Sequence, residues 1–114
     1  MLHKDRVILQ KVIREIDIGE NLLGDTEREA FCFNEMQKRA VSMTVINIGE
    51  LIKNISDDMR SAHREVPWKA VAGMRDLAAH KYQTLRMEDV YNTVKTDFPE
   101  LRKMLIQIYN EEES

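Results

Sequence analysis

The stretch GMRDLAAHKY (residues 73–82) places an arginine, a histidine and a tyrosine close together in otherwise helix-forming sequence. The guanidinium of Arg75 suits a phosphate, because it forms two parallel hydrogen bonds and opposes negative charge that develops in a transition state. The imidazole of His80 suits proton transfer near neutral pH. Attack by an RNA 2′-hydroxyl on its own phosphate needs phosphate binding and proton transfer, and it needs no metal ion. DNA lacks this hydroxyl and should be inert to such a route.

The spacing sets a condition on this chemistry. Arg75 and His80 are five residues apart, which separates them by about 140° around an ideal helix. They converge only if the helix ends near His80 or if the second residue comes from another subunit. Asp76 is four residues before His80 and faces it, so it could orient the imidazole or raise its pKa.

A purely structural interpretation of the same residues stays open at this point. Arg75 and Asp76 would pair with neighbouring charges. His80 would cap the C-terminus of its helix, and Tyr82 would pack its ring there.

Composition indicates one small helical domain over residues 1–114. Hydrophobic residues make up 43% and charged residues 32%, with only two prolines and four glycines. The net charge of −3 argues against a general nucleic-acid or membrane binder, so an anionic substrate needs a local basic pocket. Cys32 is the single cysteine, which excludes an intrachain disulfide and points to the cytoplasm. We find neither a signal peptide nor an apolar run of about 18 residues, so we expect no membrane span.

Apolar residues at three- and four-residue spacing predict an all-α fold of four or five helices. The first helix contains Leu9 and Ile16 and ends at Gly19 to Gly24, after which Asp25 or Thr26 caps the next. The other expected helices run from about residue 27 to 63, from Pro67, around Val90, and from Pro99 to a tail that frays from Glu111.

The apolar face of the second helix is unusually wide. One stripe runs through Val41, Val45, Ile48, Ile52, Ile55 and Met59, and Ala40, Met43, Ile46 and Leu51 widen it. One small bundle would have difficulty covering such a face, so we predict a homodimer. Whether Phe31 and Phe33 belong to this helix or to a separate turn is not decided by the pattern. Trp68 is predicted to anchor the core, and His3 and His63 to lie on the surface.

Three sequence blocks occur in this order along the chain: QKRAVSMTVINIGELIKNI (residues 37–55), VPWKAVAGMRDLAAHKY (66–82) and DVYNTVKTDFPELRKML (89–105). Together they resemble HepT, the HEPN-domain toxin family encoded beside MNT-type nucleotidyltransferase antitoxins. The resemblance implies an up-and-down helical bundle that dimerises, with R-x4-H-x-Y motifs of two subunits meeting in an interface cleft. It also implies a ribonuclease that needs no metal and no cofactor.

The resemblance assigns roles to individual residues. Arg75 would hold the phosphate and the transition state, and His80 would be the acid and base. Tyr82 matches the tyrosine to which the antitoxin transfers AMP from ATP. Asp76 departs from the family, in which a neutral residue, typically asparagine, follows the arginine. An aspartate would favour the charged histidine but would repel phosphate and compete for Arg75.

Several other residues are supporting candidates. Glu50 matches an acidic position of the family and could pair with the motif, as could Asn47, although a solvated helix surface explains both equally well. Lys69, Lys81 and Arg86 could form a basic rim for RNA, or an ordinary solvated surface.

Two functions are therefore expected as alternatives. The first is an endoribonuclease toxin that an antitoxin neutralises by adenylylating Tyr82. The second is a non-catalytic subunit that binds the nucleotidyltransferase and serves as its modification target.

Overall fold

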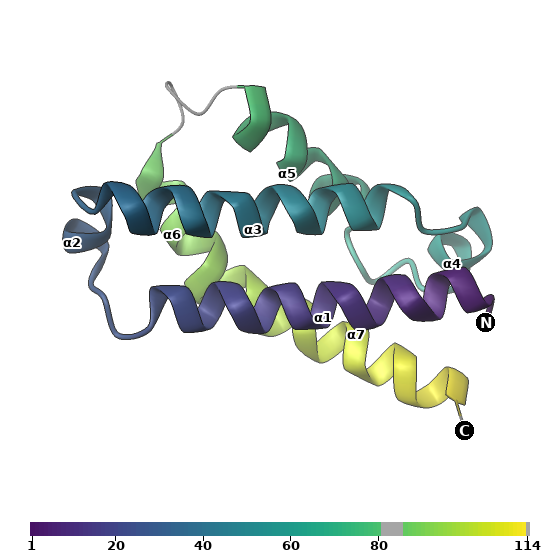
Figure 1. Cartoon of the computed structure of the whole chain (residues 1–114). Helices are drawn as coiled ribbons and strands as arrows, with labels where there is room; N and C mark the ends of the chain where they lie inside the picture. The colour runs from purple at the N-terminus through teal and green to yellow at the C-terminus, as the bar shows by residue number, and fades with distance from the viewer. Residues whose placement is uncertain (81–85, 114) are drawn as a thin grey trace.

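The computed structural model describes residues 1–80 and 86–113, and the side chains of residues 1–74 and 86–112. The described part is helical and contains no strand (Figure 1). The long helices are α1 (His3–Leu23), α3 (Glu35–Lys53), α5 (Trp68–His80) and α7 (Phe98–Glu113). The short ones are α2 (Arg28–Cys32), α4 (Asp57–Ala62), α6 (Met87–Asn92) and the π-helical turn η1 (Thr93–Asp97). This confirms the predicted all-α bundle. None of the described helices is long and apolar enough to cross a membrane.

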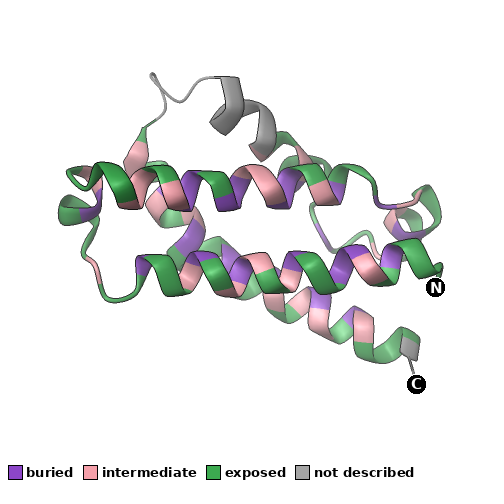
Figure 2. Ribbon diagram, in the orientation of Figure 1, coloured by how far each residue is buried: buried purple, intermediate pink, exposed green. Residues whose placement is uncertain are grey.

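Helix α3 forms the centre of the bundle, with α1 on one side and α5 on the other (Figure 1). Helix α7 packs along α1, and the start of α1 lies at the same end of the molecule as the end of α7. Buried and exposed positions recur in alternation along α1 and α3 (Figure 2), as expected for amphipathic helices. The fold therefore presents α5, which carries the Arg75 and His80 positions, on one flank of the central helix.

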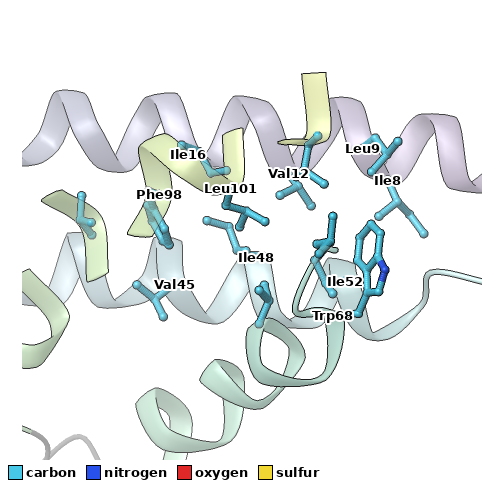
Figure 3. Packing of buried hydrophobic residues seen from close by; sticks show 14 of the residues in the cluster. Ile8, Leu9, Val12, Ile16, Val45, Ile48, Ile52, Trp68, Phe98 and Leu101 are labelled. Carbon is cyan, nitrogen blue, oxygen red and sulfur yellow. The ribbon is translucent and has the colours of Figure 1, made fainter. Parts of the chain in front are cut away.

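The hydrophobic core confirms the predicted stripe of the second helix. Val41, Ile48 and Ile52 of α3 are fully buried, and Val45 is 6% exposed. Figure 3 shows Val45, Ile48 and Ile52 of α3 meeting side chains of α1 and α7, with the ring of Trp68 closing one end. Ile46 and Leu51 pack against the edge of the core, whereas Met43 is 56% exposed. Burial of this stripe holds α3 between its neighbours.

The prediction that Gly19 and Gly24 mark the end of the first helix is confirmed for Gly24 and wrong for Gly19. Helix α1 continues to Leu23 and stops at Gly24, whose φ of 53° suits glycine. Gly19 lies inside α1 where α3 and Phe98 approach closely. A Cβ at this position would lie 3.0 Å from Thr44 Cγ2 and 3.6 Å from Phe98 Cε2. Gly19 therefore permits close packing rather than a turn.

The predicted second helix is divided into α2, α3 and α4 by side-chain caps. Asn34 Oδ1 accepts a hydrogen bond from Gln37 N at 2.9 Å, and Ser56 Oγ accepts one from Met59 N at 3.1 Å. Such caps satisfy first-turn N–H groups and start a new helix. The predicted caps Asp25 and Thr26 are not used, because Glu27 occupies the N-cap position of α2 without a side-chain hydrogen bond.

The two phenylalanines near α2 have different environments. Phe31 is fully buried and lies in α2, whereas Phe33 follows α2 and is 84% exposed. A separate helix therefore carries Phe31 into the core. This settles the question that the sequence pattern left open.

The C-terminal region differs from the prediction at two places. Pro99 does not restart the chain, since η1 leads directly into α7 and the wider π turn accommodates the missing N–H of proline. The predicted fraying from Glu111 is not observed, because α7 extends to Glu113. His63 Nε2 lies 3.1 Å from Glu112 Oε1, so His63 ties α7 to the segment after α4 rather than being a simple surface residue. This hydrogen bond, helped by the N-terminal amine, lowers the pKa of Glu112.

Candidate functional site

The start of α5 is fixed by its first residues. Pro67 precedes the helix, where the missing N–H does no harm. Trp68 is 5% exposed, and its Nε1 donates a hydrogen bond to the carbonyl of His63 at 2.9 Å. The indole is thus a core anchor, as predicted, and not an exposed stacking surface for bases. Together with buried Val71, it holds the first two turns of α5 against the core.

The backbone of α5 is helical through Arg75, Asp76 and His80, and His80 is its last residue. The side chains of these three residues lie outside the described part, as do Lys81 and Tyr82. Because the helix is continuous between them, positions 75 and 80 stand about 140° apart around one axis. This backbone geometry gives the two positions different faces of a single copy.

Asn47 and Glu50 lie together on α3, one turn apart, where they line a cavity of about 420 Å³ between α3 and α1. Lys11, Arg14 and Glu15 of α1 contribute the other charges of this cavity. Asn47 Nδ2 donates a hydrogen bond to Glu15 Oε1 at 3.3 Å, which links the two helices.

The charges of this cavity balance. Two acids, Glu15 and Glu50, and two bases, Lys11 and Arg14, line it together with apolar side chains. A balanced set does not concentrate phosphate by itself, so these residues suit a supporting or interface role better than a primary anion site. The structure joins Asn47 to Glu50 and to α1, and it does not describe their relation to the side chains of the α5 motif.

A second cluster was missed by the sequence analysis, apart from one member. Arg60 of α4, Arg64 of the following turn and Lys69 of α5 line an open groove of about 610 Å³. Only Lys69 was selected from sequence, because the three bases belong to different elements and have no common helical spacing. A local excess of basic residues between positions 60 and 69 was the available signal. Arg86, the other described candidate, is exposed at the start of α6 and lies away from this groove.

The described residues also bear on metal binding. No cluster of three or more histidine, cysteine, aspartate or glutamate side chains there has an arrangement that could hold a metal ion.

Comparison with known proteins shows the family to which the chain is similar. The family model "Ribonuclease HepT-like" matches residues 12–108. A protein of Caldanaerobacter subterraneus named "Putative RNase TTE0752" is 30% identical over 107 residues, covering 94% of this chain and 96% of its own. A Thermococcus cleftensis protein named "Probable ribonuclease HepT" is 33% identical over 100 residues, covering 88% and 89%. No solved structure gives a significant match.

The all-α bundle, with the arginine and histidine positions on one helix, is consistent with a HEPN-like protein. The match over most of the chain is more specific, and the chain belongs to the HepT-like ribonuclease family. The resemblance noted from the three sequence blocks is therefore confirmed.

Proposed function

We propose that this protein is an endoribonuclease toxin that acts in the cytoplasm, cleaves RNA without a metal ion and uses Arg75 and His80. The observation that carries the proposal is the family match over residues 12–108, which includes the helix bearing both residues. Relatives that span nearly the same length are named as ribonucleases.

The proposed reaction is an internal transfer of the phosphate. The RNA 2′-oxygen attacks the adjacent phosphorus, the bond from phosphorus to the 5′-oxygen breaks, and a 2′,3′-cyclic phosphate remains. His80 takes the proton from the 2′-hydroxyl, and a protonated His80 gives one to the leaving oxygen. Arg75 holds the phosphate and opposes the charge that develops on its oxygens.

We place this reaction in a cleft between two copies of the chain. Positions 75 and 80 stand about 140° apart around one helix, and a second copy would bring another Arg75 and another His80 to the same phosphate. The described surface also offers apolar side chains that a partner copy would cover. They are the exposed residues Ile18, Leu22, Phe33, Met36 and Met43 on or beside α1 and α3.

The double substitution Met36→Glu with Met43→Glu is expected to turn the dimer into a monomer. Met36 and Met43 are 83% and 56% exposed and lie two turns apart on α3, so two new charges there would repel a second copy without entering the core. Light scattering at micromolar concentration measures the mass. Leu2→Glu, an exposed apolar position at the start of α1, is the matched control and should stay dimeric. A wild-type monomer under these conditions would refute the dimer.

Neutralisation is proposed to occur at Tyr82. A cognate MNT-type nucleotidyltransferase would transfer AMP from ATP to the tyrosine hydroxyl. The added phosphate is anionic and bulky, and it would lie two residues after His80, where it would repel RNA and block the cleft. The chain itself would need no cofactor, since the partner uses the ATP.

One observation favours a second candidate function, that of a non-catalytic subunit. Asp76 places a carboxylate beside Arg75, where it would compete with phosphate. In that case the protein would bind the nucleotidyltransferase and offer Tyr82 without cutting RNA.

Growth of cells that express the protein without its partner separates the two functions. The toxin is expected to arrest growth, and His80→Ala is expected to relieve the arrest at equal protein level. Arrest that His80→Ala leaves unchanged would speak against catalysis by this histidine. Normal growth with the wild-type protein would favour the non-catalytic subunit.

A further inference from the structure

The groove between α4 and α5 combines positive charge with a rigid frame. Arg60, Arg64 and Lys69 line it, and its remaining lining residues are uncharged. The acid nearest in sequence, Glu65, is turned to His63, with its Oε1 3.4 Å from His63 Nδ1. An otherwise acidic chain thus collects three cations around one opening of about 610 Å³.

The frame of the groove is held at several points. The Arg60 Nη2 atom donates hydrogen bonds to the carbonyls of Lys53 at 3.1 Å and Ile52 at 3.4 Å, which fixes α4 against the end of α3. The hydrogen bond from Trp68 to the carbonyl of His63 closes the turn between α4 and α5. Because these contacts are made within the protein, the groove does not have to be ordered by its ligand.

Two of the three cations have no partner among the described residues. Arg64 and Lys69 are exposed, and neither forms a hydrogen bond or an ion pair with any described residue. Arg60 adds its charge from a more buried position, while its Nη2 is occupied by the α3 carbonyls. Arg64 and Lys69 therefore have all of their N–H donors available for phosphate oxygens.

One side of the groove is formed by α5, the helix that carries the proposed catalytic positions. Lys69 is in the first turn of α5, six residues before Arg75 and eleven before His80. At the rise of an α-helix these separations are about 9 Å and about 16 Å along the axis. Eleven residues complete about three turns, so positions 69 and 80 fall on the same side of α5. An extended RNA strand needs only a few nucleotides to cover this distance.

We propose that the groove formed by Arg60, Arg64 and Lys69 binds the phosphate backbone of the RNA strand that extends from the cleavage site. This inference rests on the proposed ribonuclease function, because that function supplies the strand. The contacts are to phosphates and not to bases, so the groove strengthens binding without reading the sequence. It supplies the local positive pocket that a chain of net charge −3 needs to hold RNA.

The test is RNA binding by the double variant Arg64→Gln/Lys69→Gln. The probe is a labelled single-stranded RNA whose 2′-oxygens are all methylated, so that none can attack and binding is measured without cleavage. Fluorescence anisotropy gives the Kd at several salt concentrations. Loss of two phosphate contacts is expected to reduce the slope of log K against log salt by about 1.4, and to weaken binding about 10- to 30-fold at 0.1 M salt.

The matched control is Lys4→Gln/Lys103→Gln, which removes the same charge from exposed lysines of α1 and α7 outside the groove. Its slope should stay close to the wild-type value. The inference is overturned if the two double variants bind alike, or if the wild-type protein does not bind the probe at all. Binding that depends on the groove, with no cleavage of ordinary RNA, would refute the proposed catalysis and leave the groove assignment supported.

Discussion

Replacing His80 by alanine is expected to slow RNA cleavage by about 10²- to 10⁴-fold, the range in which a positioned acid or base contributes to catalysis. Under the proposed reaction the variant can neither remove the 2′-proton nor protonate the leaving oxygen. Cleavage of a labelled RNA by the purified protein, followed on a denaturing gel, measures the effect. Because His80 is the last residue of α5, thermal unfolding should show that the variant remains folded.

His3→Ala is the matched control for this result. His3 is an exposed histidine at the start of α1, so its loss removes an imidazole without touching α5. The control should cleave RNA at the wild-type rate. Equal activity of the His80 and His3 variants would remove His80 from the mechanism.

Tyr82→Phe is expected to abolish the gain in mass that follows incubation with the nucleotidyltransferase and ATP. The phenol oxygen is the proposed acceptor of AMP, and phenylalanine lacks that oxygen while keeping the ring. Mass spectrometry of the intact protein should show one or more AMP groups on the wild type and none on the variant. The same wild-type sample should lose its RNA cleavage as the modification proceeds.

Tyr91→Phe and Tyr109→Phe are the controls for this experiment. Tyr91 donates its hydroxyl to the carbonyl of Thr26 at 2.8 Å, and the Tyr109 hydroxyl lies 2.7 Å from Gln10 Nε2. Both hydroxyls are already engaged in the fold, so these variants should accept AMP as the wild type does. Modification of Tyr82→Phe at another residue would show that Tyr82 is only structural.

Much of the fold could be predicted because burial follows helical spacing. The stripe that includes Val41, Ile48 and Ile52 lies in the core as its spacing indicates. The errors come from residues whose role depends on neighbours distant in sequence. Gly19 resembles a helix terminator, but its place is set by the approach of Thr44 and Phe98. Likewise, the π turn before Pro99, through which the helix continues without a break, leaves no clear mark in the sequence.

The helix boundaries show the same limit. Ser56 begins α4 where one long helix was predicted, and it is bonded to Asp5, which is only 2% exposed. Ser56 Oγ donates to Asp5 Oδ2 at 2.6 Å, and Ser56 N donates to Asp5 Oδ1 at 3.0 Å. A buried carboxylate that is fully hydrogen-bonded in this way links the start of α1 to the start of α4. Sequence spacing does not reveal a contact across 51 residues.

The candidate site could be predicted only in part. Arg75 and His80 stand out because their residue types match the needs of phosphodiester chemistry and because the surrounding blocks resemble a family. The basic groove does not stand out, because Arg60 and Lys69 come together only when the turn after α4 folds back through the hydrogen bond of Trp68. Local motifs can be recognised in the sequence, whereas a surface formed by several helices can be recognised only in the folded structure.

The proposed mechanism requires that the protein cleave RNA with its own side chains and without a metal ion. The most direct measurement is incubation of the purified protein with a labelled RNA in EDTA, beside the same oligonucleotide made as DNA. We expect RNA cleavage at an undiminished rate in EDTA, products that end in a 2′,3′-cyclic phosphate, and intact DNA. Cleavage that EDTA abolishes, or cleavage of the DNA strand, would contradict this mechanism.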